Sequence, residues 1–99
     1  MRRARIEVIK LGWDPEVKAD WVKTVCTDQK VGQVFYTSGK HGDACPEGMC
    51  YLAWQSLQAI IQTLVRGGKM FGKYDSYTGC CPNAGRPVVY RIEIVDMPQ

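Results

Sequence analysis

Two segments in which apolar and polar residues alternate, one near each end of the chain, constrain the fold most. In the first, Ala4, Ile6 and Val8 alternate with arginine and glutamate, the pattern of a strand with one buried face. We predict a strand over residues 3–10. A second strand is predicted over residues 88–95, after a turn at residues 82–85. We expect the two strands to be neighbours in one sheet. The apolar side of the second strand would consist of Val88, Tyr90, Ile92 and Ile94.

The clearest helical pattern lies between these two segments. Pro46 and Glu47 suit a first helical turn, and the pair Gly67-Gly68 suits a helix end. We expect this helix to pack on the apolar face of the sheet. The predicted fold class is therefore α+β: a small single-layer sheet, with the terminal strands as neighbours, packed against one long central helix. The apolar residues that recur at helical spacing are Cys50, Ala53, Trp54, Leu57, Ile60, Ile61, Leu64 and Val65.

Three other segments have less regular patterns. Residues 14–22 begin with Asp and Pro, which suit a helix N-terminus, and they predict a short helix. Residues 32–37 are rich in β-forming residues and predict a strand, followed by a turn-rich loop over residues 38–43. Residues 69–79 mix glycine and charged residues with aromatic ones. They indicate a loop anchored by aromatic side chains, with a short strand before Cys80.

The length of 99 residues predicts a single domain over residues 1–99. With 45% hydrophobic and 23% charged residues, the composition is that of a globular protein. No apolar stretch reaches the roughly 18–20 residues that a membrane span needs. The basic start alternates with apolar residues instead of entering the apolar core of a signal peptide. We therefore expect a cytoplasmic protein that does not contact the membrane.

The net charge of +3 arises within the first ten residues, because acidic and basic residues balance in the rest of the chain. Basic residues are not clustered elsewhere and no nucleic-acid-binding motif is present, so nucleic acid is not a favoured partner. A protein or a small molecule is the expected partner. A homodimer stays open, because a domain of this size has little surplus stability.

The cysteines are the residues most suited to chemistry. The chain has five, which is many for a cytoplasmic domain of this length: Cys26, Cys45, Cys50, Cys80 and Cys81. Disulfides are disfavoured in a reducing compartment, and an odd number cannot pair completely. Three explanations stay open: a metal or cluster site, a reactive thiol, or inert buried cysteines.

Local sequence distinguishes among these cysteines. Cys45 precedes Pro46 at the predicted helix N-terminus, where backbone N–H groups would lower the pKa of a thiol, so it is the best candidate for a thiolate. Cys50 lies one turn further on and should face the core. Cys80 and Cys81 are adjacent and should point to opposite faces, so one metal ion would take only one of them. Cys81 precedes a turn that exposes N–H groups, which makes it the better ligand.

A tetrahedral zinc or iron–sulfur site needs about four soft ligands. Cys26, Cys45, Cys50 and one cysteine of the adjacent pair could supply them, with His41 in reserve. His41 lies in a glycine-rich loop and could instead act as a base beside a cysteine nucleophile. The Cys45-x4-Cys50 spacing is looser than most metal-ligand spacings, which keeps both hypotheses open.

Several short motifs follow one another along most of the chain. They are Arg5-Ile6-Glu7-Val8, Gly32-Gln33-Val34-Phe35, Pro46-Glu47-Gly48-Met49-Cys50 with Ala53-Trp54, Gly67-Gly68, and Cys80-Cys81-Pro82-Asn83-Ala84-Gly85-Arg86-Pro87-Val88. Together they resemble a family of small prokaryotic cysteine-containing proteins with PEG-x-C and CCP-x-x-G-RPV motifs. The last motif is the most specific of the set.

This resemblance implies a different choice of cysteines, although it names no reaction. It implies that the cysteines of the family are Cys26, Cys50, Cys80 and Cys81, and it favours Cys26, Cys50 and Cys81 as the functional ones. In the metal-binding hypothesis all four family cysteines are the ligands, with Cys45 a weaker candidate because it is particular to this chain. It also points to Arg86, beside the cysteine pair, as a residue that could hold an anion or a thiolate.

Three functions are consistent with these residues. The first is a small metal-binding accessory domain with zinc or an iron–sulfur cluster as cofactor. The second is a thiol-dependent enzyme or redox protein in which His41 or Arg86 assists one cysteine. The third is a binding module in which the cysteines are inert.

Overall fold

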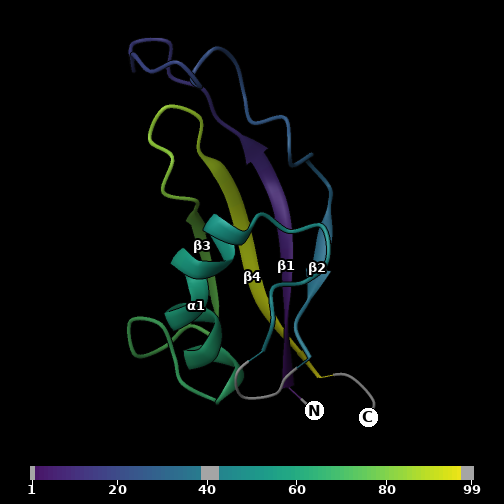
Figure 1. Cartoon of the computed structure of the whole chain (residues 1–99). Coiled ribbons are helices and arrows are strands. Elements are labelled where there is room, and N and C mark those ends of the chain that lie inside the picture. The colour runs from purple at the N-terminus through teal and green to yellow at the C-terminus, as the bar shows by residue number, and fades with distance from the viewer. Residues whose placement is uncertain (1, 39–42, 97–99) are drawn as a thin grey trace.

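The computed structural model describes residues 2–38 and 43–96. The elements along the chain are β1 (Arg2–Leu11), β2 (Val34–Tyr36), α1 (Tyr51–Val65), β3 (Ser76–Cys80) and β4 (Val88–Asp96). The strands form one antiparallel sheet in the order β2-β1-β4-β3, and α1 lies against one face of it (Figure 1). The predicted fold class is confirmed, including the pairing of the two terminal strands and the helix packed on the sheet.

The centre of the sheet is the long pairing of β1 with β4. Ile6 lies opposite Ile92, and both side chains face α1. On the other face Arg5 lies opposite Glu93, so that opposite charges are paired across the strands. The register shifts between Val8 and Lys10, where one extra residue in β1 forms a bulge. The alternation in the sequence therefore separates a buried face from a charged one.

The core lies between α1 and this buried face. Each large aliphatic side chain that is fully buried contributes roughly 1.5–3 kcal/mol through the hydrophobic effect. The helix ends as predicted, because Gly67 adopts a left-handed conformation with φ of 91° and Gly68 N–H donates to the Thr63 carbonyl. The buried residues of the core on the two layers are Ala4, Ile6, Val8, Val88, Tyr90 and Ile92 from the sheet, and Ala53, Trp54, Leu57, Ile61 and Leu64 from α1.

The predicted start of this helix is wrong. Helix α1 begins at Tyr51, with Cys50 as its N-cap residue, and not at Pro46. Residues 46–49 form a separate turn in which Met49 N–H donates to the Pro46 carbonyl at 3.1 Å. Gly48 has a φ of 87°, a left-handed conformation that interrupts a right-handed helix.

The short helix predicted over residues 14–22 does not form either. This segment consists of turns and bends. Its start is tied to the chain before β4, because Gly12 N–H donates to the Pro87 carbonyl at 2.7 Å and Asp14 N–H donates to the Gly85 carbonyl at 2.8 Å. The Asp14 carboxylate accepts from Glu16 N–H at 3.0 Å, which forms a local turn where a helix cap was expected.

The other predicted strands form with adjusted bounds, whereas most of the loop predicted over residues 38–43 lies outside the described residues. Strand β2 is shorter than the predicted residues 32–37, and β3 is the short strand expected before Cys80. The segment between β3 and β4 is irregular and contains the expected turn. Within the described part of the chain, no helix is long and apolar enough to cross a membrane.

Candidate thiol pocket

Three of the predicted site cysteines line one pocket. Cys26 comes from the loop before β2, Cys50 from the N-cap of α1, and Cys81 from the residue after β3. The pocket has a volume of about 150 Å³ and is also lined by Arg86 and Tyr90. We call it the thiol pocket. Segments that are far apart in the sequence thus bring three cysteines to one pocket. Its remaining lining residues are Asp28, Leu52, Asn83 and Val88.

The adjacent cysteines differ as their alternation predicts. Cys81 is buried, and its sulfur accepts a hydrogen bond from Val88 N–H at 3.3 Å. Cys81 N–H donates to the Val88 carbonyl at 3.1 Å, which extends the β3–β4 ladder by one residue. Cys80 is exposed and lines a separate pocket beside α1. Cys80 therefore does not share the thiol pocket with the other three predicted ligands.

A buried glutamine organises the back of the thiol pocket. The Gln29 amide nitrogen donates to the carbonyls of Asp28 at 2.8 Å and Gly48 at 2.9 Å. Its amide oxygen accepts from the Tyr90 hydroxyl at 3.0 Å and from Cys50 N–H at 3.4 Å. Both hydrogens of the amide group and its oxygen are engaged, as burial requires. Gln29 thereby ties the loop of Cys26, the N-cap of α1 and strand β4 together.

The buried Tyr90 hydroxyl lies near several thiols. Burial raises the pKa of this hydroxyl well above its usual range, and the nearby thiols of Cys50, Cys81, Cys26 and Cys45 raise it further. The hydroxyl consequently stays protonated and remains the donor to Gln29. Four cysteines therefore lie near enough to influence one buried phenol, although Cys45 does not line the pocket itself.

Cys45 does not have the character that its sequence position predicted. Its thiol donates to the Met49 carbonyl at 3.4 Å and the Pro46 carbonyl at 3.6 Å. Burial raises the pKa of the Cys45 thiol, and the nearby Cys50 raises it further. The predicted lowering was wrong because the helix begins six residues later, so the N-terminal N–H groups of α1 do not face Cys45.

Two features favour negative charge in the thiol pocket. Arg86 lines it, and the buried Nε of this side chain has no hydrogen-bond partner among the described residues. Cys50 is the N-cap of a helix, an end that favours anions, and its side chain forms no capping hydrogen bond. Asp28 also lines the pocket and carries the opposite charge, so the Arg86 guanidinium is the group there that could hold an anionic ligand or a thiolate.

The predicted metal ligands are not arranged as a ready metal site. Over residues 2–38 and 43–96, no three His, Cys, Asp or Glu side chains are spaced to hold one metal ion. His41, the candidate base and reserve ligand, lies outside the described residues. The structure therefore brings Cys26, Cys50 and Cys81 to one pocket without the geometry of a bound ion.

Several residues of the pocket were not predicted from the sequence. Gln29 lies in a polar segment without periodicity, so no local signal marks it as buried. Tyr90 was predicted to face the core, but the role of its hydroxyl depends on a partner 61 residues away. Leu52 and Asn83 join the lining because α1 starts late and the turn after Cys81 folds toward it.

The fold and the site define a small α+β domain that carries a pocket of free thiols. Comparison with protein-family models, curated proteins and solved structures finds no match to this chain. The resemblance to the prokaryotic cysteine-containing family stays a prediction.

Proposed function

We propose that this domain performs thiol chemistry on a small molecule bound in the thiol pocket, with Cys50 as the nucleophile. The observation that carries the proposal is the convergence of Cys26, Cys50 and Cys81 on one pocket that Arg86 also lines. Reactive cysteines are partly accessible and lie near positive charge. A reducing cytoplasm, the compartment expected from the sequence, is where such thiols stay free.

Cys50 is favoured over the other cysteines by its surroundings. The sulfur of Cys81 is buried and accepts a backbone hydrogen bond, and the thiol of Cys45 has a raised pKa. Cys50 is half-buried, lines the pocket and sits at the N-cap of α1. It therefore combines access with a helix end that favours the negative charge of a thiolate.

The proposed step is thiol–disulfide exchange with a small disulfide. The Cys50 thiolate attacks one sulfur, an S–S bond forms, and the old S–S bond breaks, with its electron pair leaving on the second sulfur as a thiolate that takes a proton from water. Cys26 or Cys81 then attacks Cys50 and releases the second thiol. Two cysteine thiols are oxidised to one disulfide while the small disulfide is reduced to two thiols.

Single replacements test the assignment of the nucleophile. We expect the fast phase of the reaction with an aromatic disulfide to disappear in Cys50→Ser and to persist in Cys80→Ser, the matched change at an exposed cysteine outside the pocket. Release of the aromatic thiol is followed by absorbance. Equal rates for Cys50 and Cys80 would overturn the proposal.

Metal binding is the second candidate function, and the same convergence of sulfur atoms favours it. Cys26, Cys50 and Cys81 would be three ligands of zinc or an iron–sulfur cluster if their side chains rearranged on binding, with the fourth position supplied from elsewhere. Cys80, although predicted as a ligand, lies at a separate pocket.

A titration with cobalt(II) distinguishes the two candidates. Metal binding predicts one equivalent bound, intense thiolate-to-metal absorption, and loss of that absorption in Cys26→Ser and Cys81→Ser. Protein purified without oxygen would also contain stoichiometric zinc or iron and would melt at a lower temperature after chelation. The absence of all these signals rejects the metal-binding function and leaves thiol exchange.

A further inference from the structure

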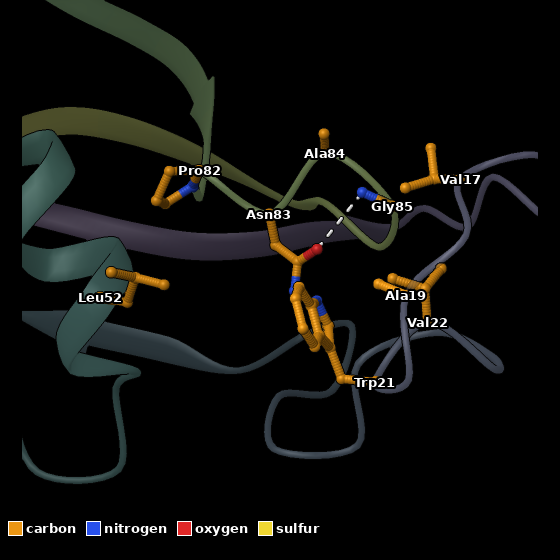
Figure 2. Close-up of a pocket in the computed structure, with 9 residues that line it drawn as sticks. All are labelled: Val17, Ala19, Trp21, Val22, Leu52, Pro82, Asn83, Ala84 and Gly85. Atoms are coloured by element: carbon orange, nitrogen blue, oxygen red, sulfur yellow. Dashed lines mark hydrogen bonds between the residues drawn. The ribbon is translucent and has the colours of Figure 1, made fainter.

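An apolar cleft adjoins the thiol pocket. It has a volume of about 320 Å³. Figure 2 shows Leu52 of α1 at one end and Val17 and Val22 at the other, with Trp21 and Asn83 between them in this view. The other lining residues are Ala19, Pro82, Ala84 and Gly85.

The cleft and the thiol pocket share two lining residues. Leu52 and Asn83 line both of them. The Asn83 side-chain oxygen accepts from the N–H groups of Gly85 and Arg86, each at 3.3 Å, and so fixes the turn that carries Arg86. Figure 2 shows the first of these two hydrogen bonds. A ligand in the cleft would therefore contact residues that also line the thiol pocket.

The chemistry of the two compartments is complementary. Trp21 and Leu52 both line the cleft and are 61% and 55% exposed, so both offer apolar surface to a ligand there. In the thiol pocket, the buried Nε of Arg86 has no partner among the described residues. One compartment suits a flat apolar group and the other suits a negative charge.

We infer that the cleft and the thiol pocket form one binding site for a small amphipathic anion, with an aromatic body between Trp21 and Leu52 and a negatively charged head at Arg86. This inference rests on the proposed function and deepens it, because it names the substrate class as aromatic or similarly flat anionic disulfides. The volume of the cleft lies within the range of small-molecule pockets and suits a small aromatic ring system.

Fluorescence titration of the full chain with anilinonaphthalene sulfonate, an aromatic anion without a reactive group, tests the site. We expect one saturable site. Leu52→Asn and Trp21→Ala should each weaken binding by about tenfold, or ~1.4 kcal/mol. The matched control is Phe71→Ser, a change at a side chain that is 76% exposed and lines neither compartment. Far-ultraviolet circular dichroism verifies that each variant folds.

The charge of the ligand head is tested with Arg86→Gln. This variant should weaken the anionic probe by about tenfold, ~1.4 kcal/mol, and leave the affinity for the neutral phenylnaphthylamine unchanged. Equal loss for both probes would overturn the role of Arg86. Non-saturable binding, or a Phe71→Ser effect as large as that of Leu52→Asn, would overturn the site.

The probe forms no covalent bond, so its binding is measured independently of thiol reactivity. A chain that binds the probe as described, but whose Cys50 reacts no faster than Cys80, keeps this site and loses the proposed chemistry. If Cys50 reacts fast but the cleft variants bind the probe as tightly as the parent does, the proposed chemistry is supported and this binding site is rejected.

Discussion

Gln29 holds the thiol pocket together through a single side chain. It ties its own loop to two other parts of the chain: the segment before α1, through the Gly48 carbonyl and Cys50 N–H, and strand β4, through the Tyr90 hydroxyl. An unsatisfied buried polar group costs about 1–3 kcal/mol. Removing the amide group of Gln29 leaves several buried polar groups without a hydrogen-bond partner at once.

We therefore expect Gln29→Leu to lower the free energy of unfolding by about 2–4 kcal/mol. Urea denaturation measures this change. The matched control is Gln55→Ala, because Gln55 is exposed and bonds the Tyr51 hydroxyl on the helix surface. The control should change stability by less than about 0.5 kcal/mol. Similar effects of the two variants would contradict the role of Gln29.

The raised pKa of Cys45 predicts a loss of stability in alkali. The folded chain holds this proton more firmly than the unfolded chain, whose thiol titrates near its ordinary value of about 8.5. Its contribution is fully present below that pH and is lost as pH rises through the higher folded pKa. Denaturation at a series of pH values should show this decline. Cys45→Ala should make it shallower, whereas Cys80→Ala should leave it unchanged.

At this scale the sequence predicted what depends on neighbours in the chain. The alternation of adjacent residues predicted that Cys80 and Cys81 point apart, and one is exposed while the other is buried. The environment of Cys45 depends on where the helix begins and could not be predicted from its flanking residues. The role of Gln29 depends on contacts across three segments, and no local pattern indicates them.

At the scale of elements, some features of α1 follow from neighbouring residues and could be predicted, whereas its starting residue could not. Periodic apolar residues predicted the body of the helix and its glycine end, because both follow from local geometry. The N-terminus of the helix was predicted at least one turn too early, because Pro46 and Glu47 favour a helix start by their residue types alone. Gly48 in its left-handed conformation overrides that preference.

Because α1 starts at Tyr51, its N-cap residue is Cys50, at a position where side chains with an oxygen acceptor are preferred. Cys50 has the extended conformation of an N-cap residue, with φ −60° and ψ 124°, but its side chain forms no capping hydrogen bond. Serine at this position can accept one. We expect Cys50→Ser to unfold at the same or a higher urea concentration, with a gain of up to ~1 kcal/mol. A loss of more than about 1 kcal/mol would show that the sulfur packs as a structural group.

At the scale of the whole molecule, the segment after β1 and the turn before β4 meet at Gly85. A Cβ atom added there would lie 2.5 Å and 2.7 Å from the two methyl carbons of Val22. This contact holds the segment that was wrongly predicted as a helix against the turn before β4. The same approach of the two segments forms the apolar cleft beside the thiol pocket.

We expect Gly85→Ala to destabilise the protein by about 1–3 kcal/mol through overpacking. Val22→Ala should relieve much of the clash, so the double variant should be more stable than the two single effects predict when added. Thermal unfolding of the four proteins measures this coupling. Strict additivity would show that the two segments do not press on each other.

The pairing of β1 with β4 also sets the order of events during synthesis. Strand β1 is made roughly 80 residues before the strand that it pairs with most extensively, a delay of about 4–16 s at 5–20 residues per second. Throughout that interval Ala4, Ile6 and Val8 belong to an apolar strand without its main neighbour. We therefore expect the sheet to assemble only after β4 has been synthesised.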